Sequence, residues 1–145
     1  TLNAHLQANI PSNRLITLFY AEYDPFTGSL RYVNGGHNAP YVLRPGGVER
    51  LHATGMALGI VPDAVYDVLE TKLVPGDRLF LFTDGITEAN DASDNEYGEE
   101  RLEARLTAQR ALPPPELIES VREDVLAFCG NIRPRDDMTM MLVAR

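Results

Sequence analysis

The sequence predicts an α+β domain in which helices pack on a largely antiparallel sheet system. Three observations support this prediction: strand-like segments joined by short turns over residues 15–51, an apolar strand at 78–83, and two amphipathic helical segments before a closing strand. Turns of about two to five residues join antiparallel neighbours, whereas parallel strands need longer crossovers. Strands and helices that follow each other in separate runs are typical of the α+β class.

Composition limits the classes of protein to which the chain can belong. Its 145 residues suffice for a real core, and we expect residues 1–145 to form a single domain. The net charge of −8 argues against nucleic acid binding, which needs a basic surface. No apolar stretch approaches the ~20 residues of a membrane helix, so we expect no membrane contact from this segment. The single cysteine, Cys129, and the lack of a signal peptide pattern favour the cytoplasm.

The N-terminal half of the chain is expected to contain one helix and a series of strands. Residues 1–10 (TLNAHLQANI) place apolar side chains four positions apart, which is typical of a helix. Strands are expected at 15–23, 29–33, 41–44 and 48–51, in an antiparallel meander whose turns contain proline and glycine. A further strand is expected at 66–74.

The C-terminal half is expected to contain a central strand, two helices and a last strand. The strand at 78–83 (RLFLFT) is apolar on successive residues, which indicates burial on both faces. Helices are expected at 98–110 and 113–129, the second with prolines in its first turn and a glycine after its end. The strand MTMMLVA follows at 138–144.

The histidine, cysteine and glycine patterns indicate structural roles. His37, in the loop NGGHN, is expected to be hydrogen-bonded within its loop, and the histidines lack the spacing of a zinc site. Cys129 lies in an apolar helical pattern that favours a buried thiol. The glycine pairs at 35–36 and 46–47 lack the following lysine of a phosphate loop and indicate turns.

The acidic segment 84–100 contains seven carboxylates and no lysine or arginine. A calcium loop of the EF-hand type starting at Asp91 would need a glycine in its middle and a glutamate at its last position. Glu96 and Leu102 stand at those positions. We therefore interpret most of these acids as a solvated loop that leads into a helix, and leave a calcium-responsive loop at 91–100 as a weaker alternative.

Two other acidic positions border apolar strands. Asp84 ends the strand LFLFT, and Asp136 and Asp137 precede MTMMLV. A carboxylate at a strand end is held by rigid backbone and still reaches solvent, where it can bind a hard divalent cation. Gly85 removes a side chain that would crowd such a site. The spacing alone leaves open that both strand ends are ordinary turns that use aspartate.

Taken together, these segments resemble a known family. LITLFYAEYDPFTGSLRYVNGGHNAPYVL, LFLFTDGITEA and RDDMTMMLVAR stand in the order found in the SpoIIE-like, RsbU-like bacterial branch of the metal-dependent (type 2C) protein phosphatases. The resemblance implies a four-layer α-β-β-α fold, an antiparallel β-sandwich flanked by helices. It also implies hydrolysis of phosphoserine or phosphothreonine in proteins with two Mn²⁺ or Mg²⁺ ions.

The resemblance also implies roles for single residues. Asp84 and Asp136 would be the catalytic metal-binding carboxylates, with Asp137 a less fixed metal neighbour and Gly85 contributing through its backbone. The loop NGGHN would be architectural or line the site. The family's early D-x-x-G-x-G segment, which carries another metal aspartate, has no match in this sequence, and neither do the first strands of the sandwich. We therefore expect residues 1–145 to be the C-terminal part of such a domain, weakly active or inactive alone.

The resemblance further implies a phosphorylated regulatory protein as the partner. An anti-sigma factor antagonist in bacterial partner-switching or stress signalling is an example. The alternative is a non-catalytic, phosphatase-like module that binds a signalling protein. Because unpaired strand edges invite pairing with another chain, we also expect a homodimer or a higher oligomer.

Overall fold

The structure is a computed structural model that describes residues 1–11 and 13–145. The chain divides into two compact units, of which the first contains residues 1–39, 51–75 and 145 and the second the remainder. Each unit holds one sheet, and every strand pair within the described residues is antiparallel. The predicted α+β class with two antiparallel sheets is confirmed.

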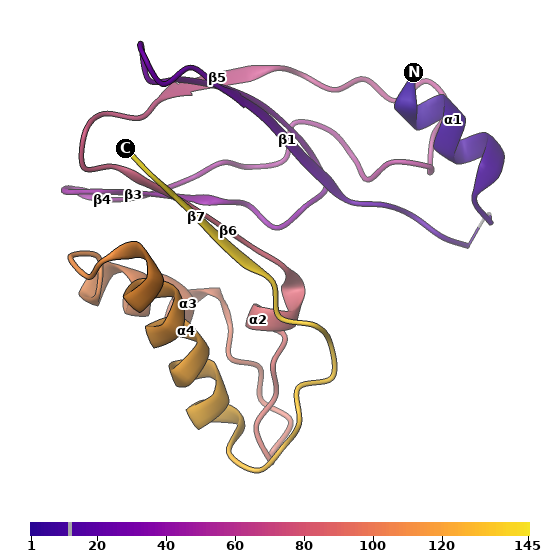
Figure 1. Cartoon of the computed structure of the whole chain (residues 1–145). Coiled ribbons are helices and arrows are strands. Elements are labelled where there is room, and N and C mark those ends of the chain that lie inside the picture. Colours follow the sequence, from indigo (N-terminus) through magenta and orange to yellow (C-terminus); the bar gives the residue numbers. More distant parts are fainter. Residues whose placement is uncertain (12) are drawn as a thin grey trace. The chain divides into compact units, whose positions relative to one another are not determined.

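The first unit combines one helix, α1 (Leu2–Asn9), with a three-stranded sheet (Figure 1). The strands are β1 (Leu18–Tyr23), β2 (Ser29–Gly35) and β5 (Leu69–Lys72), in the order β1-β2-β5. The predicted turn between β1 and β2 is present. Asp24 Oδ1 accepts the N–H of Phe26 at 2.8 Å, and Gly28 adopts a φ of 80°, which suits glycine.

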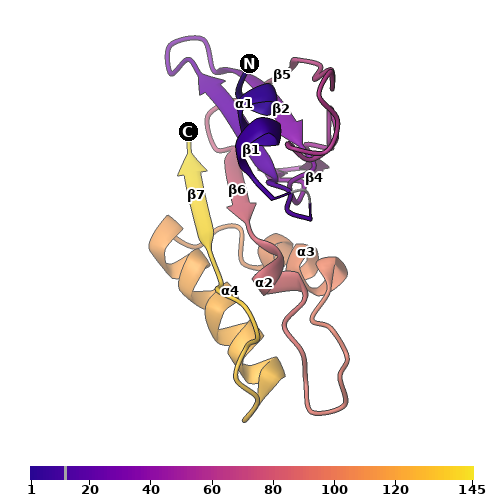
Figure 2. The same cartoon turned by 90° about the vertical axis from the view of Figure 1, so that its right-hand side faces the viewer.

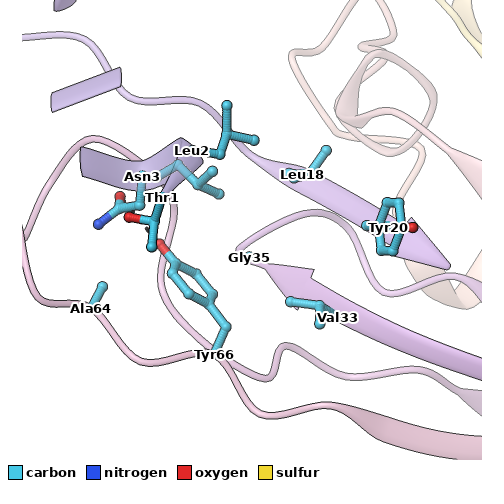
Figure 3. Close-up of a pocket in the computed structure, with 10 residues that line it drawn as sticks. Thr1, Leu2, Asn3, Leu18, Tyr20, Val33, Gly35, Ala64 and Tyr66 are labelled. Carbon is cyan, nitrogen blue, oxygen red and sulfur yellow. Dashed lines mark hydrogen bonds between the residues drawn. The ribbon is translucent and has the colours of Figure 1, made fainter. Parts of the chain in front are cut away.

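Asn3 fastens α1 to the loop before β5. Its buried side chain donates to the carbonyls of Val61 and Pro62 at 2.8 and 3.0 Å. Its Oδ1 accepts the N–H of Gly59 at 2.9 Å. Beside α1 lies a largely apolar cavity of about 320 Å³, with walls from α1, β1, β2 and the loop before β5 (Figure 3).

The second unit contains a four-stranded sheet and three helices. The strands β3 (Tyr41–Arg44), β4 (Gly47–Arg50), β6 (Arg78–Phe82) and β7 (Met140–Ala144) lie in the order β4-β3-β6-β7. The helices are α2 (Asp84–Thr87), α3 (Glu99–Ala108) and α4 (Pro114–Cys129). Helices α3 and α4 pack on this sheet, and α4 runs beside β7 (Figure 2).

The core of the second unit lies between its sheet and its helices. It includes the buried side chains of Tyr41, Leu43, Phe80, Phe82, Leu102, Leu106, Leu117, Val121 and Val125. Within each helix these members recur every four residues, as the apolar pattern of the sequence predicts. Cys129 continues this face of α4, and burial raises the pKa of its thiol. The predicted structural role of Cys129 is confirmed.

Two details of the fold differ from the sequence prediction. The meander prediction places β2 beside β3, but these strands belong to different sheets, so the prediction is wrong. Gly36, with a φ of 71°, and Pro40, which has no N–H, do not continue a strand ladder, and the chain leaves the first sheet between them. The one-turn helix α2 also follows β6 where the sequence predicts only a break.

None of the helices in residues 1–11 and 13–145 has both the length and the apolar composition needed to cross a membrane.

Candidate metal site

Asp84 lies just after the end of β6 and is the first residue of α2. The preceding residue, Thr83, extends the pairing of β6 with β7: its N–H donates to the carbonyl of Thr139, and its Oγ1 accepts the N–H of Thr139, both at 3.1 Å. Thr83 Oγ1 also donates to the carbonyl of Asp137 at 3.2 Å. Thr83 therefore ties the end of β6 to the segment that carries Asp136 and Asp137.

Gly85 allows the two segments to come this close. A Cβ added to Gly85 would lie 2.4 Å from the carbonyl oxygen of Asp137 and 3.4 Å from the carbonyl carbon of Asp136. The first distance is far below van der Waals contact, so any larger residue would force the backbone of 136–137 away. Gly85 therefore has a steric role at this junction. A backbone contribution of Gly85 to metal binding stays a prediction.

Asp84, Asp136 and Asp137 all reach solvent. Asp84 Oδ1 accepts the N–H of Gly85 at 3.0 Å, and Asp136 Oδ1 accepts the N–H of Asp137 at 2.7 Å. Within the described part of the chain, no donor bonds to Oδ2 of either residue or to the side chain of Asp137. Each carboxylate therefore keeps at least one oxygen for a ligand.

The donor set fits a hydrated, hard cation. Mg²⁺ and Mn²⁺ prefer carboxylate oxygens, and Mg²⁺ commonly keeps several waters while binding through one or two carboxylates. No group of three or more His, Cys, Asp and Glu side chains within residues 1–11 and 13–145 is placed to hold a metal ion by itself. Asp84 and Asp136 are thus candidates for part of a metal site, with solvent supplying further ligands.

A polar pocket of about 230 Å³ adjoins Asp136. Its walls include Gly85, Glu88, Asn90, Asp94, Arg135 and Asp136. Arg135 donates to Asp94 Oδ1 at 2.7 Å, which joins the acidic segment to the segment before β7. Because both side chains are more than two-thirds exposed, this ion pair contributes little to stability. Its effect is to bring the acidic segment beside the candidate site.

Asp91 organises the tip of the acidic segment. Its Oδ1 accepts the backbone N–H groups of Ser93 and Asn95 at 2.8 and 2.9 Å, and its Oδ2 accepts the side-chain amide of Asn95 at 2.9 Å. The hydrogen bonds from Asn95, followed by the bond from Ser93, lower the pKa of the Asp91 carboxyl. Both oxygens of Asp91 therefore serve a turn, which favours the solvated loop over the calcium alternative.

The NGGHN loop supports the first unit through hydrogen bonds. Asn34 is buried, its amide donates to the carbonyl of Leu51 at 3.1 Å, and its Oδ1 accepts the N–H of His37 at 2.8 Å. The His37 ring lies 3.3 Å from the hydroxyl of Thr17, measured at Nδ1. The backbone of His37 is thus hydrogen-bonded within its loop, whereas its ring contacts Thr17, outside the loop.

Comparison with known proteins identifies the family. The model of the stage II sporulation protein E (SpoIIE) family matches residues 1–145. The chain belongs to the SpoIIE family. Protein IcfG of Synechocystis sp. is 32% identical over 130 residues, which cover 89% of this chain and 20% of IcfG. Phosphoserine phosphatase RsbU of Bacillus subtilis is 26% identical over 147 residues, which cover 99% of this chain and 43% of RsbU. The chain spans less than half the length of either relative.

Solved structures support the fold of this SpoIIE-family chain. The PP2C phosphatase domain of SpoIIE from Bacillus subtilis, solved with a fragment of its regulatory domain, gives a TM-score of 0.79 at 22% identity, covering 98% of this chain and 41% of that one. A Mn-presoaked structure of the SpoIIE phosphatase domain gives 0.69 at 22% identity, covering 88% and 56%. At these identities the likeness establishes the fold alone. The roles of Asp84 and Asp136 stay predictions.

Sequence reasoning overlooked two residues at the candidate site, Thr83 and Arg135. Thr83 occupies the last position before Asp84, where a hydroxyl can bond a neighbouring strand. Arg135 directly precedes Asp136, and the acidic segment 84–100 contains no lysine or arginine of its own. An arginine next to a candidate ligand was the available signal for an ion pair with the acidic segment.

Proposed function

We propose that this chain forms the C-terminal part of a metal-dependent protein phosphatase domain that hydrolyses phosphoserine or phosphothreonine. Its membership of the SpoIIE family supports the reaction class, and its relative RsbU is named a phosphoserine phosphatase. The observation that carries the assignment to residues is the close approach at Gly85. Gly85 and the hydroxyl of Thr83 both lie against the carbonyl of Asp137, which supports the proposal that Asp84 and Asp136 act at one site.

In this proposal Asp84 and Asp136 hold Mn²⁺ or Mg²⁺, with Asp137 as a weaker neighbour. A bound ion of this kind acidifies water and neutralises the charge of a phosphate group. The chain itself supplies the placement: strand pairing through Thr83 and the tight packing at Gly85 fix the backbone from which the carboxylates project. Exposure of all three aspartates leaves room for a phosphorylated segment of another protein.

The same geometry limits what the isolated chain can do. Two principal carboxylates leave a two-ion centre incomplete, because such a centre clamps the attacking and leaving oxygens between paired metals. We infer that the chain alone binds metal weakly and turns over little substrate. A complete site would take a further carboxylate from outside these residues.

We further propose that the substrate is a phosphorylated regulatory protein, such as an anti-sigma factor antagonist, and that the reaction takes place in the cytoplasm. Its similarity to RsbU supports a role in signalling. A second candidate function is a phosphatase-like module that binds such a protein without catalysis. That candidate applies if no carboxylate from outside these residues completes the metal site, since the described residues hold no group of three metal-binding side chains.

The test is hydrolysis of a phosphoserine peptide, with Mn²⁺ present, by the natural protein that carries this chain. Asp84→Asn and Asp136→Asn should each lower kcat/KM by at least about 100-fold, since losing a ligand should cost more than losing a residue that orients one. Asp63→Asn, an exposed carboxylate of the first unit, is the matched control and should leave kcat/KM unchanged. Full activity of Asp84→Asn would contradict the site, and an inactive wild type would favour the binding module.

A further inference from the structure

A basic pocket lies in the second unit, away from the candidate metal site. It has a volume of about 280 Å³, and its walls include Arg44, Pro45, Gly76, Arg78, Arg110 and Ala111. Arg78 begins β6, whereas Asp84 follows the end of that strand. At ~3.3 Å of rise per residue, the length of β6 alone separates the two places by about 13 Å. The basic pocket is therefore distinct from the site of the proposed hydrolysis.

The charge of Arg44 is balanced within the second unit. Its Nη1 donates to Asp77 at 2.6 Å, and its Nη2 donates to Glu49 at 2.6 Å. Asp77 is fully buried, so this ion pair is a fixed part of the wall. Arg44 therefore shapes the wall of the basic pocket, but its positive charge is offset by the two carboxylates that it binds.

Arg78 and Arg110 differ from Arg44 because neither forms an ion pair with any residue that the structure describes. Arg78 Nη1 donates to the carbonyl of Leu112. Arg110 Nη1 donates to the carbonyls of Arg44 and Pro45 at 3.0 and 2.5 Å, which holds the α3–α4 loop beside the β3–β4 turn (Figure 1). These bonds orient both guanidinium groups without neutralising them.

Two oriented, uncompensated guanidinium groups on one hollow are suited to an oxyanion. A guanidinium stays charged at all working pH values, and its planar fork matches the oxygens of phosphate. Among the described residues each group bonds only through its Nη1, which leaves the Nε and Nη2 donors for a ligand. The chain as a whole carries a charge of −8, so a positive hollow is not a general property of its surface.

We propose that the basic pocket binds a phosphate group through Arg78 and Arg110. The phosphate is either free inorganic phosphate or the phosphate of a phosphoserine side chain. This binding goes beyond the proposed hydrolysis, because it needs no metal and uses none of the aspartates of the candidate site.

The test is a titration of the ¹⁵N-labelled chain, followed by amide chemical shifts, with EDTA present and ionic strength held constant with sodium chloride. Sodium phosphate is one probe and a short phosphoserine peptide is the other. Saturable shifts are expected at the amides of Gly46, Gly76 and Ala111, which lie in or beside the wall. A tighter response to the peptide would assign the site to phosphoprotein, and equal responses would assign it to the free ion. Absence of saturable shifts with both probes would overturn the proposal.

Two variants separate this site from non-specific attraction of anions. Arg110→Gln should weaken the response at Gly46 and Ala111 by at least 10-fold in apparent Kd. Arg122→Gln removes the same charge from an exposed position on α4, where the arginine pairs with Glu119, and should leave the response unchanged. Equal responses of the wild type and Arg110→Gln would overturn the proposal. The titration does not measure turnover, so its result tests phosphate binding whether or not the protein hydrolyses a phosphopeptide.

Discussion

Gly85 shows how strongly the candidate site depends on a single missing side chain. The backbone after β6 passes so close to the carbonyl of Asp137 that no Cβ fits between them. The hydroxyl of Thr83 donates to the same carbonyl and accepts the N–H of Thr139. The two aspartates that the sequence singles out are therefore positioned by neighbours that carry no charge.

Gly85→Ala should lower the free energy of unfolding by about 1–3 kcal/mol, because the added methyl group overpacks a junction formed by backbone. Gly46→Ala is the matched control, since a Cβ at Gly46 would meet no atom within 4 Å. Urea unfolding followed by circular dichroism measures both variants. Equal stability of the two variants would show that the backbone at this junction can shift without loss of stability.

At the scale of residues, the sequence revealed the candidate ligands but not the contacts that place them. Asp84 and Asp136 are visible because each borders an apolar strand. The contacts of Thr83 and Arg135 join positions 54 and 41 residues apart. Such contacts follow from strand pairing and cannot be deduced from local patterns. The positions of the aspartate carboxylates relative to each other likewise depend on the fold.

Two buried tyrosines in the second unit differ in whether their hydroxyl groups form a hydrogen bond. Tyr97, two residues before α3, is buried, and its hydroxyl donates to Asp124 of α4 at 2.6 Å. Tyr41 of β3 is also buried, but its hydroxyl has no hydrogen-bond partner among the described residues. Two tyrosines of one core therefore contribute differently: Tyr97 links the segment before α3 to α4, and Tyr41 acts mainly through its ring.

Tyr97→Phe should lower the free energy of unfolding by about 1–3 kcal/mol, because it removes a hydrogen bond from a buried hydroxyl to a charged carboxylate. Tyr41→Phe removes a hydroxyl that has no partner, so it should be neutral or slightly stabilising. Thermal unfolding of the two variants under one buffer compares them directly. A larger loss for Tyr41→Phe than for Tyr97→Phe would contradict this difference.

Stability should also fall at alkaline pH. Burial raises the pKa of Tyr41 from 10.0 to about 12, and burial followed by the bond to Asp124 raises the pKa of Tyr97. A raised pKa contributes stability that is complete below the unfolded value of 10.0 and is lost as the pH rises through the folded value. Urea midpoints should therefore decline from pH 10 to pH 12. The decline should be shallower in Tyr41→Phe. Identical slopes of the urea midpoint against pH in this variant and the wild type would show that Tyr41 does not cause the loss of stability.

At the scale of elements, local sequence patterns predicted whether a segment is a helix or a strand better than they predicted which strands pair. Both long helices and the apolar strand β6 lie within the segments predicted for them. The distribution of strands over two sheets was not predictable, because turn length determines only whether neighbours in sequence can pair. β2 pairs with β5 and β3 pairs with β6, and these partnerships depend on the whole core. Helix α2 is a single turn, too short to leave a periodic pattern.

For the whole molecule, each sheet formed by the described residues ends in two edge strands, β1 and β5 in the first sheet and β4 and β7 in the second. Within the described residues β5 pairs only with β2, and β7 pairs only with β6. An exposed edge offers backbone donors and acceptors to another chain. The half-exposed side chain of Leu69 on β5 adds apolar surface at such an edge.

We therefore expect a dimer or a higher oligomer, measured by light scattering during size-exclusion chromatography. Leu69→Lys places a charge on the edge strand β5 and should shift the distribution toward the monomer. Val74→Lys, which lies outside the strand but is similarly exposed, is the control. A stable monomer of the unmodified chain would contradict the prediction.

The assignment of Asp84 and Asp136 as metal ligands is tested most directly by Mn²⁺ binding to the chain itself. The electron paramagnetic resonance signal of free hydrated Mn²⁺ reports the unbound ion during a titration. We predict weak, saturable binding that is lost in Asp84→Asn and in Asp136→Asn and is retained in Asp63→Asn. Binding by Asp84→Asn equal to that of the wild type would show that Asp84 is not a metal ligand.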